Sequence, residues 1–171
     1  MILKDPISLD DYSAKLAEWE GTPYRDTTMR CGVGVDCVRF VVAIADWLHG
    51  FDTEALPPPP VLPRQTSLHN ASLAWSVVRW LRERYKPNQT IWKPDDSSFP
   101  FPELRPGDIL CVKTEIHPGH AMIAGPRPNE LWHSYNSLPR GGVSNCALSW
   151  CFHQKHALLR VWRPLSIRLA M

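Results

Sequence analysis

One cysteine in the first third of the chain has the surroundings that nucleophilic catalysis needs. Cys37 follows a loop containing Gly32 and Gly34 and opens a strongly apolar segment that runs to residue 49. Apolar residues recur there at helical spacing, which predicts a buried helix with Asp36 as N-cap and Cys37 in the first turn. Backbone amides and the helix dipole favour an anion at that place, so we expect a lowered thiol pKa and a reactive thiolate.

A base for this thiol is available in the second half of the chain. His120 opens one expected strand and His133 lies on the next, joined to it by a short connection. In the right register the two imidazoles lie beside each other on one face of the sheet. A thiol, an imidazole and a second polar group that orients the imidazole are the working parts of thiol hydrolases. Taken singly, each of these residues is more simply explained by packing in the core, and their combination indicates catalysis.

The elements that must position these residues are expected to be helical in the first half of the chain and extended in the second. Helical spacing of apolar residues covers residues 8–20, 37–49 and 66–85, and the first helix begins with a Ser8–Asp11 capping box. Strands are predicted at residues 109–113, 120–124, 130–135 and 156–164. N-terminal helices packed on a C-terminal antiparallel sheet make an α+β fold, in a single domain spanning residues 1–171. A proline-rich strap and the third helix form an insertion at about residues 52–104, and residues 91–105 are expected to be irregular.

Composition argues against several other classes of protein. The 171 residues carry a formal net charge of +2 with the arginines spread along the chain, so no nucleic-acid partner is expected. No apolar run approaches the roughly 18 residues of a membrane span, so no membrane partner is expected. The N-terminal sequence has acidic residues where a signal peptide is apolar, so we expect synthesis in the cytoplasm without a signal peptide.

The remaining cysteines and histidines do not form a metal site in the sequence pattern. Five cysteines, an odd number without paired short spacing, predict neither a disulfide framework nor a zinc site. His117 and His120 are separated by Pro-Gly, which cannot be helical, and only His120 leads directly into an apolar strand. His120 is therefore the expected base, and no metal is expected. The other cysteines are assigned to packing: Cys31, Cys111, Cys146 and Cys151.

Five short segments, standing in the same order, resemble motifs of the NlpC-type papain-like cysteine peptidases, which cut peptidoglycan stem peptides. The segments are GTPY at 21–24, VDCVRF at 35–40, RPGDIL at 105–110, HAMIAG at 120–125 and WHSY at 132–135. The resemblance implies a papain-like NlpC-type fold with Cys37 as nucleophile, His120 as base and His133 as the residue that orients His120. Tyr24 matches the tyrosine that approaches the catalytic cysteine in this family. Tyr24 and Asp36 are therefore expected at the oxyanion and substrate-binding part of the site.

The resemblance also implies a reaction and a setting. The implied reaction is hydrolysis of an amide in a peptidoglycan stem peptide through a thioester on Cys37, with no metal or organic cofactor. The proline-rich insertion, the helix after it and the VWRP ending at 161–164 resemble the branch found in phage tails and gene-transfer particles. That branch implies synthesis in the bacterial cytoplasm, partners in a phage tail tip, hub or baseplate, and action on the host cell wall during DNA entry.

Two alternatives stay open at this point. One is a structural tail or baseplate subunit that keeps the fold without turnover, and the other is a cytoplasmic amidase or acyltransferase acting on a small amide. Two stretches differ from the family pattern: residues 25–27 after the tyrosine are RDT, and residues 38–39 after the cysteine are VR. We therefore expect a bulkier and more charged substrate groove beside Cys37.

Overall fold

The structure is a computed structural model that describes residues 5–51, 71–92, 103–113, 120–136, 141–153, 157–165 and 167–170. The helices are α1 (Leu9–Trp19), α2 (Cys37–His49), α3 (Ala71–Arg84) and α4 (Leu148–His153). The strands are β1 (Met29–Arg30), β2 (Gly34–Val35), β3 (Asn88–Trp92), β4 (Ile109–Lys113), β5 (His120–Ala124), β6 (Glu130–Tyr135), β7 (Gly142–Ala147) and β8 (Ala157–Pro164). This is an α+β arrangement, as the sequence predicted.

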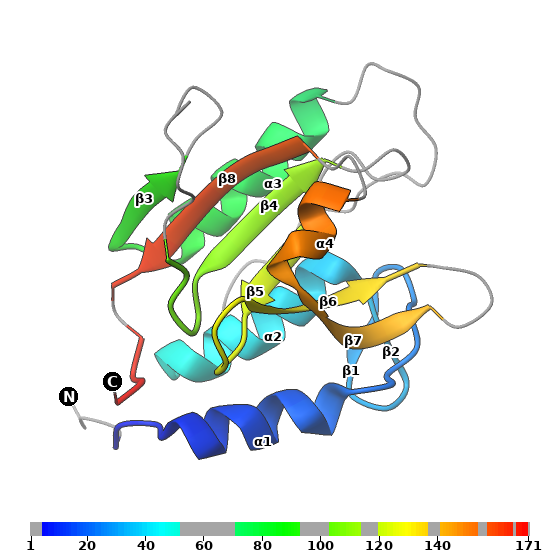
Figure 1. Cartoon of the computed structure of the whole chain (residues 1–171). Helices are drawn as coiled ribbons and strands as arrows, with labels where there is room; N and C mark the ends of the chain where they lie inside the picture. The colour runs from blue at the N-terminus through cyan, green and yellow to red at the C-terminus, as the bar shows by residue number, and fades with distance from the viewer. Residues whose placement is uncertain are drawn as a thin grey trace.

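The larger sheet has six strands in the order β3-β8-β4-β5-β6-β7, and every neighbouring pair is antiparallel. In Figure 1, α2 and α3 lie behind this sheet and α4 lies in front of it, while α1 runs along its lower side. The short strands β1 and β2 pair with each other just before α2. The two ends of the described chain meet through a bridge between Ile7 and Leu169. The expected helices on an antiparallel sheet are therefore present.

Five elements of the described chain were not predicted: the two-residue strands β1 and β2, which lie in the segment expected to be a loop, and β3, β7 and α4. The expectation that residues 91–105 are irregular is wrong for Ile91 and Trp92, because both belong to β3. β3 pairs with β8, so the insertion expected at residues 52–104 supplies an edge strand of the main sheet. The proline-rich strap and the start of the third helix lie outside the described residues, and α3 is described from residue 71.

The first two helices begin as their sequences indicate. The Ser8 hydroxyl accepts a hydrogen bond from the Asp11 amide, and the Asp11 carboxylate accepts one from the Ser8 amide, which completes the capping box. Asp36 caps α2 by accepting from the Arg39 amide, and Gly50 ends the helix in the left-handed conformation with φ 69°. Nearly every side chain of α2 is buried, so the predicted core helix is confirmed.

The two faces of the main sheet carry two separate apolar clusters. Alternation of side chains along each strand sends one set toward α1 and α2 and the other toward α4. The set on the α2 side comprises Ile109, Cys111, Ala121, Ile123, Trp132 and Trp162. The set on the α4 side comprises Leu110, Val112, Met122, Ala124, Leu131 and Val161, together with Leu148 of α4. By the same alternation His120 and His133 belong to the face that carries Met122 and Leu131.

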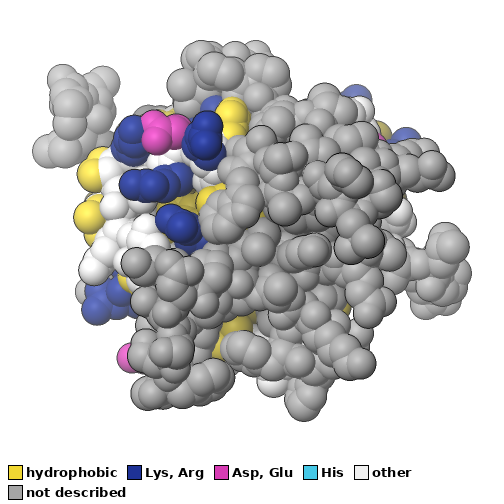
Figure 2. Space-filling model, turned by 90° about the horizontal axis from the view of Figure 1, so that it is seen from above, with side chains coloured by type: hydrophobic (Ala, Val, Ile, Leu, Met, Phe, Trp, Pro, Cys, Tyr) yellow, Lys and Arg dark blue, Asp and Glu magenta, His cyan; other side chains and the backbone are white. Residues whose placement is uncertain are grey.

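One side of α3 carries charged residues that face solvent. Its exposed residues include Arg79, Arg82 and Glu83, and Figure 2 shows lysine and arginine side chains gathered with acidic ones on the face seen from above. Arg84, the last residue of α3, turns inward and pairs with the buried Asp46 of α2 at 2.6 Å. None of the described helices combines the length and apolar character needed to cross a bilayer.

Candidate active site

The start of α2 is held by the side chain of its cap. The Asp36 carboxylate accepts hydrogen bonds from the Arg39 amide at 2.9 Å, the Arg39 guanidinium at 2.6 Å and the Thr27 amide at 3.0 Å. These bonds fix the first turn of α2 to the loop before it, and so fix Cys37. The Asp36 carboxylate accepts hydrogen bonds and would repel an oxyanion. Its role in this geometry is therefore to hold the first turn of α2, and with it Cys37, in place. Arg39 is nearly buried and paired with Asp36, which neutralises part of the charge expected beside Cys37.

The two histidines are in direct contact. Nε2 of His120 lies 2.7 Å from Nδ1 of His133, and the ring centroids are 5.0 Å apart at an interplanar angle of 74°. Only 1% of His120 and 3% of His133 is exposed. β5 and β6 pair through Ile123 with Trp132 and Ala124 with Leu131, and this register makes the two histidines diagonal neighbours on one face. The prediction that the imidazoles lie side by side is confirmed.

The thiol of Cys37 lies at the same end of these strands. The amide of Ala121, the residue after His120, donates a hydrogen bond to the Cys37 sulfur. On the neighbouring strand, the Ser134 hydroxyl donates to the Val35 carbonyl oxygen at 2.8 Å. The turn from β2 into α2 is therefore attached to both β5 and β6 beside the histidine pair. The structure therefore brings Cys37 against the strand that carries His120, at the residue that follows this histidine, and His120 in turn contacts His133.

The charge state of Cys37 differs from the expectation. Burial raises the pKa of the Cys37 thiol to about 12, and the nearby Asp36 carboxylate acts in the same direction. Hydrogen bonds from the backbone amides of Ala121, Val38 and Cys37 act the other way but are outweighed. The expectation of a lowered pKa is wrong for this structure because only 3% of Cys37 is exposed. The resting thiol is therefore neutral.

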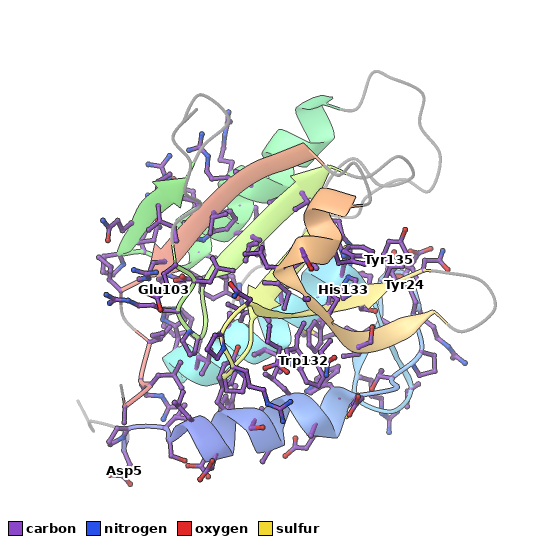
Figure 3. The ribbon with its side chains drawn as sticks, in the orientation of Figure 1. Asp5, Tyr24, Glu103, Trp132, His133 and Tyr135 are labelled. Atoms are coloured by element: carbon purple, nitrogen blue, oxygen red, sulfur yellow. The ribbon has the colours of Figure 1, made fainter. Side chains whose placement is uncertain are left out.

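Tyr24 lies near the start of α2, since its backbone pairs with Val35, two residues before Cys37. Burial, the Cys37 thiolate charge and a hydrogen bond from its hydroxyl to Asp26 all raise the pKa of Tyr24, so the hydroxyl stays protonated. A bridge between Tyr24 and Val35 and a hydrogen bond from its amide to the Gly141 carbonyl oxygen hold the backbone. Figure 3 labels Tyr24 in the same region as His133 and Tyr135.

Among the other cysteines, the three whose side chains the structure describes divide into two kinds. Burial raises the pKa of the Cys111 thiol, and it raises that of Cys146 to about 12, which fits their assignment to packing. Cys31 is exposed and its thiol donates to the Glu18 carbonyl oxygen at 2.9 Å, so its assignment to packing is wrong. The side chain of Cys151 lies outside the described residues.

Sequence reasoning missed two aromatic residues of this site. Tyr135 is the last residue of the WHSY motif on β6, and Trp150 lies on α4, a helix of six residues. Both rings lie within 6 Å of the His133 ring. The aromatic residue two positions after His133 was a usable signal, because it shares the strand face of that histidine. No local sequence pattern could have assigned Trp150 to the site, because its position depends on the pairing of β7 with β6 just before α4.

The described residues contain no group of three or more His, Cys, Asp or Glu side chains that could hold a metal ion. His117 and His156 lie outside the described residues. No protein-family model and no curated protein matches this chain. The case for a function therefore stands on the geometry of the site and on the motifs.

Proposed function

We propose that the protein is a cysteine endopeptidase that hydrolyses an amide bond in peptidoglycan stem peptides. Cys37 is the nucleophile, His120 the base and His133 the residue that orients His120. The observation that supports this most is the 2.7 Å contact between His120 and His133, formed where the Ala121 amide meets the Cys37 sulfur. Packing alone gives no reason for two nearly buried imidazoles to pair beside a buried thiol.

The contacts of His120 define the path of the proton. For His120 to accept a proton at Nδ1, its Nε2 must carry hydrogen and donate to Nδ1 of His133. Since the resting thiol is neutral, His120 takes this proton as the Cys37 sulfur attacks the substrate carbonyl. The protonated His120 then gives the proton to the leaving amine. Water hydrolyses the thioester with the same imidazole as base.

The negative charge on the carbonyl oxygen needs hydrogen-bond donors at the start of α2. The Cys37 amide belongs to the first turn of the helix, where amides are not used by the helix itself. One well-placed donor of this kind contributes about 3 kcal/mol to the stability of the transition state. In this proposal Tyr24, whose hydroxyl donates to Asp26, belongs to the substrate-binding part of the site.

One observation favours a second candidate, a structural tail or baseplate subunit without turnover. Cys37 is 3% exposed and its thiol is neutral, which suits a cysteine that packs in the core. Delivery on a phage-like tail, with tail tip, hub or baseplate partners, is part of both candidates and rests on the motif resemblance. A small-amide hydrolase or acyltransferase would use the same residues on a different substrate.

Digestion of purified peptidoglycan sacculi, with mass spectrometry of the released muropeptides, tests the proposal. We expect new peptide fragments from the wild type and from Cys31→Ala, an exposed-thiol control, and none from Cys37→Ala or His120→Ala. Fragments that persist in Cys37→Ala would show that the nucleophile is wrong. If wild type with a reduced thiol releases no fragment from several wall types, the structural subunit becomes the better conclusion.

A further inference from the structure

Two aromatic rings, those of Tyr135 and Trp150, contact the histidine pair. The ring centroid of Trp150 is 5.1 Å from that of His133, at an interplanar angle of 62°. The Tyr135 ring is 5.7 Å from His133 and 5.6 Å from His120. Tyr135 and Trp150 also meet edge to face, 5.6 Å apart at 83°. The four rings form one cluster in which each imidazole contacts at least one aromatic ring.

The fold brings Trp150 to this cluster through β7 and α4. β7 pairs with β6 along its length, which puts His133 opposite Ser144 and Glu130 opposite Ala147 in the sheet. At the end of β7 the Leu148 amide donates to the Asn129 carbonyl oxygen at 2.8 Å, which ties the first residue of α4 to the β5–β6 connection. Leu148 then packs on the sheet face of Met122 and Leu131, and α4 lies in front of that face in Figure 1.

This ring cluster acts on His133 in two ways. Edge-to-face contacts at these distances hold a ring plane, because rotation would lose the favourable alignment of the quadrupoles. Rotation of the His133 ring out of this plane would move Nδ1 away from His120, so the held plane preserves the 2.7 Å contact. Aromatic faces within about 6 Å also attract a positive charge, and more strongly where water is excluded.

We propose that Trp150 is a positioning residue for the hydrolysis. It holds the His133 imidazole on His120 and, with Tyr135, stabilises the positive charge that the pair acquires when His120 takes the thiol proton. The catalytic consequence rests on the proposed function. The effect on the histidine pair itself does not depend on any substrate.

The groups that face the pair make this effect measurable. The titratable group in ring contact with the pair is Tyr135 on β6. At the start of α2, Cys37 with Asp36 meets the strand of His120 through the Ala121 amide. The positions paired with the histidines on β4 and β7 are the uncharged Val112 and Ser144. Trp150 carries no charge, so replacing it changes the aromatic surroundings and leaves the formal charges as they are.

Matched variants separate the aromatic ring from its bulk. Trp150→Leu keeps an apolar side chain without a π face, Trp150→Phe keeps a π face, and Trp80→Ala on α3 removes a half-buried tryptophan from another part of the molecule. With ¹⁵N-labelled histidine, NMR titration reports the tautomer and apparent pKa of the His120–His133 pair. We expect Trp150→Leu to lower that apparent pKa by about half to one unit, since the ring favours the protonated form. Trp150→Phe and Trp80→Ala should stay close to wild type.

Kinetics provide the second measurement. We expect Trp150→Leu to reduce kcat on muropeptides about ten- to hundred-fold with KM within about twofold, and Trp150→Phe to restore most of kcat. The acid limb of the pH profile should move to lower pH with the histidine pKa, because the base must be unprotonated. An unchanged histidine titration in folded Trp150→Leu overturns the inference, even if kcat falls. If the wild type releases no muropeptide, the proposed function fails. The NMR titration still decides whether Trp150 positions the histidine pair, because it needs no substrate.

Discussion

The neutral state of Cys37 predicts a slow reaction with iodoacetamide. Because its pKa is raised to about 12, about one thiol in ten thousand is ionised at pH 8. A free cysteine with a pKa of about 8.5 is about one quarter ionised at that pH. The more basic thiolate is intrinsically about 40-fold more nucleophilic, which leaves a net deficit of about 60-fold. Exclusion of the reagent from a sulfur on a residue only 3% exposed adds to this deficit.

The assay is timed alkylation, followed by acid quenching and mass spectrometry of the Cys37 peptide, with glutathione in the same reaction as reference. We expect Cys37 to react at least about 60-fold more slowly than glutathione at pH 8, and its rate to rise about tenfold per pH unit from pH 7 to 9. In urea it should react like a free thiol. His120→Ala should change little, because no ion pair is present at rest. Fast alkylation that is flat from pH 5 to 8 and disappears in His120→Ala would refute the reasoning from burial.

Three further predictions concern the scaffold of the site. Arg84→Met removes the guanidinium that pairs with the fully buried Asp46, so urea denaturation should show a loss of about 3–5 kcal/mol in the free energy of unfolding. Lys86→Ala, at an exposed ion pair after the same helix, should leave that free energy unchanged. Gly142→Ala would place a Cβ 2.6 Å from a main-chain carbonyl oxygen, so we expect a lower melting temperature by calorimetry. Burial lowers the pKa of His49 to about 4, so the unfolded chain takes up the proton first. The free energy of unfolding of the protein should fall by up to about 3 kcal/mol as the pH drops from about 6.5 to 4. His49→Phe should flatten this pH dependence.

The parts of the fold that the sequence predicted are those with strong local signals. α1 begins where Ser8 and Asp11 form a capping box, and α2 begins after Asp36, because a short polar side chain satisfies amides that the first turn leaves open. The strands β4, β5, β6 and β8 are rich in apolar or β-branched residues and were placed within about a residue of their observed ends. Local sequence was sufficient for these elements.

The elements that were missed depend on partners far along the chain. β7 has the sequence GVSNCA, whose small and polar residues have weak strand preference, and it is extended because β6 offers an open edge. β3 lies in the part of the insertion that follows α3, and it pairs with β8. α4 has six residues, too few for a helical pattern to be recognised. Trp150 could not be assigned to the site without both β7 and α4.

The charge of Cys37 shows the same limit of local reasoning. A helix N-terminus favours a thiolate when water or a cation can share its charge, and three backbone amides do lower the thiol pKa here. The sulfur is also enclosed between α2 and the strands that carry His120 and His133, and this tertiary burial is the larger effect. A thiol that is neutral at rest needs a base that is correctly oriented before the substrate arrives. Catalysis at this site would therefore depend more on how firmly His133 holds His120 than on the acidity of Cys37.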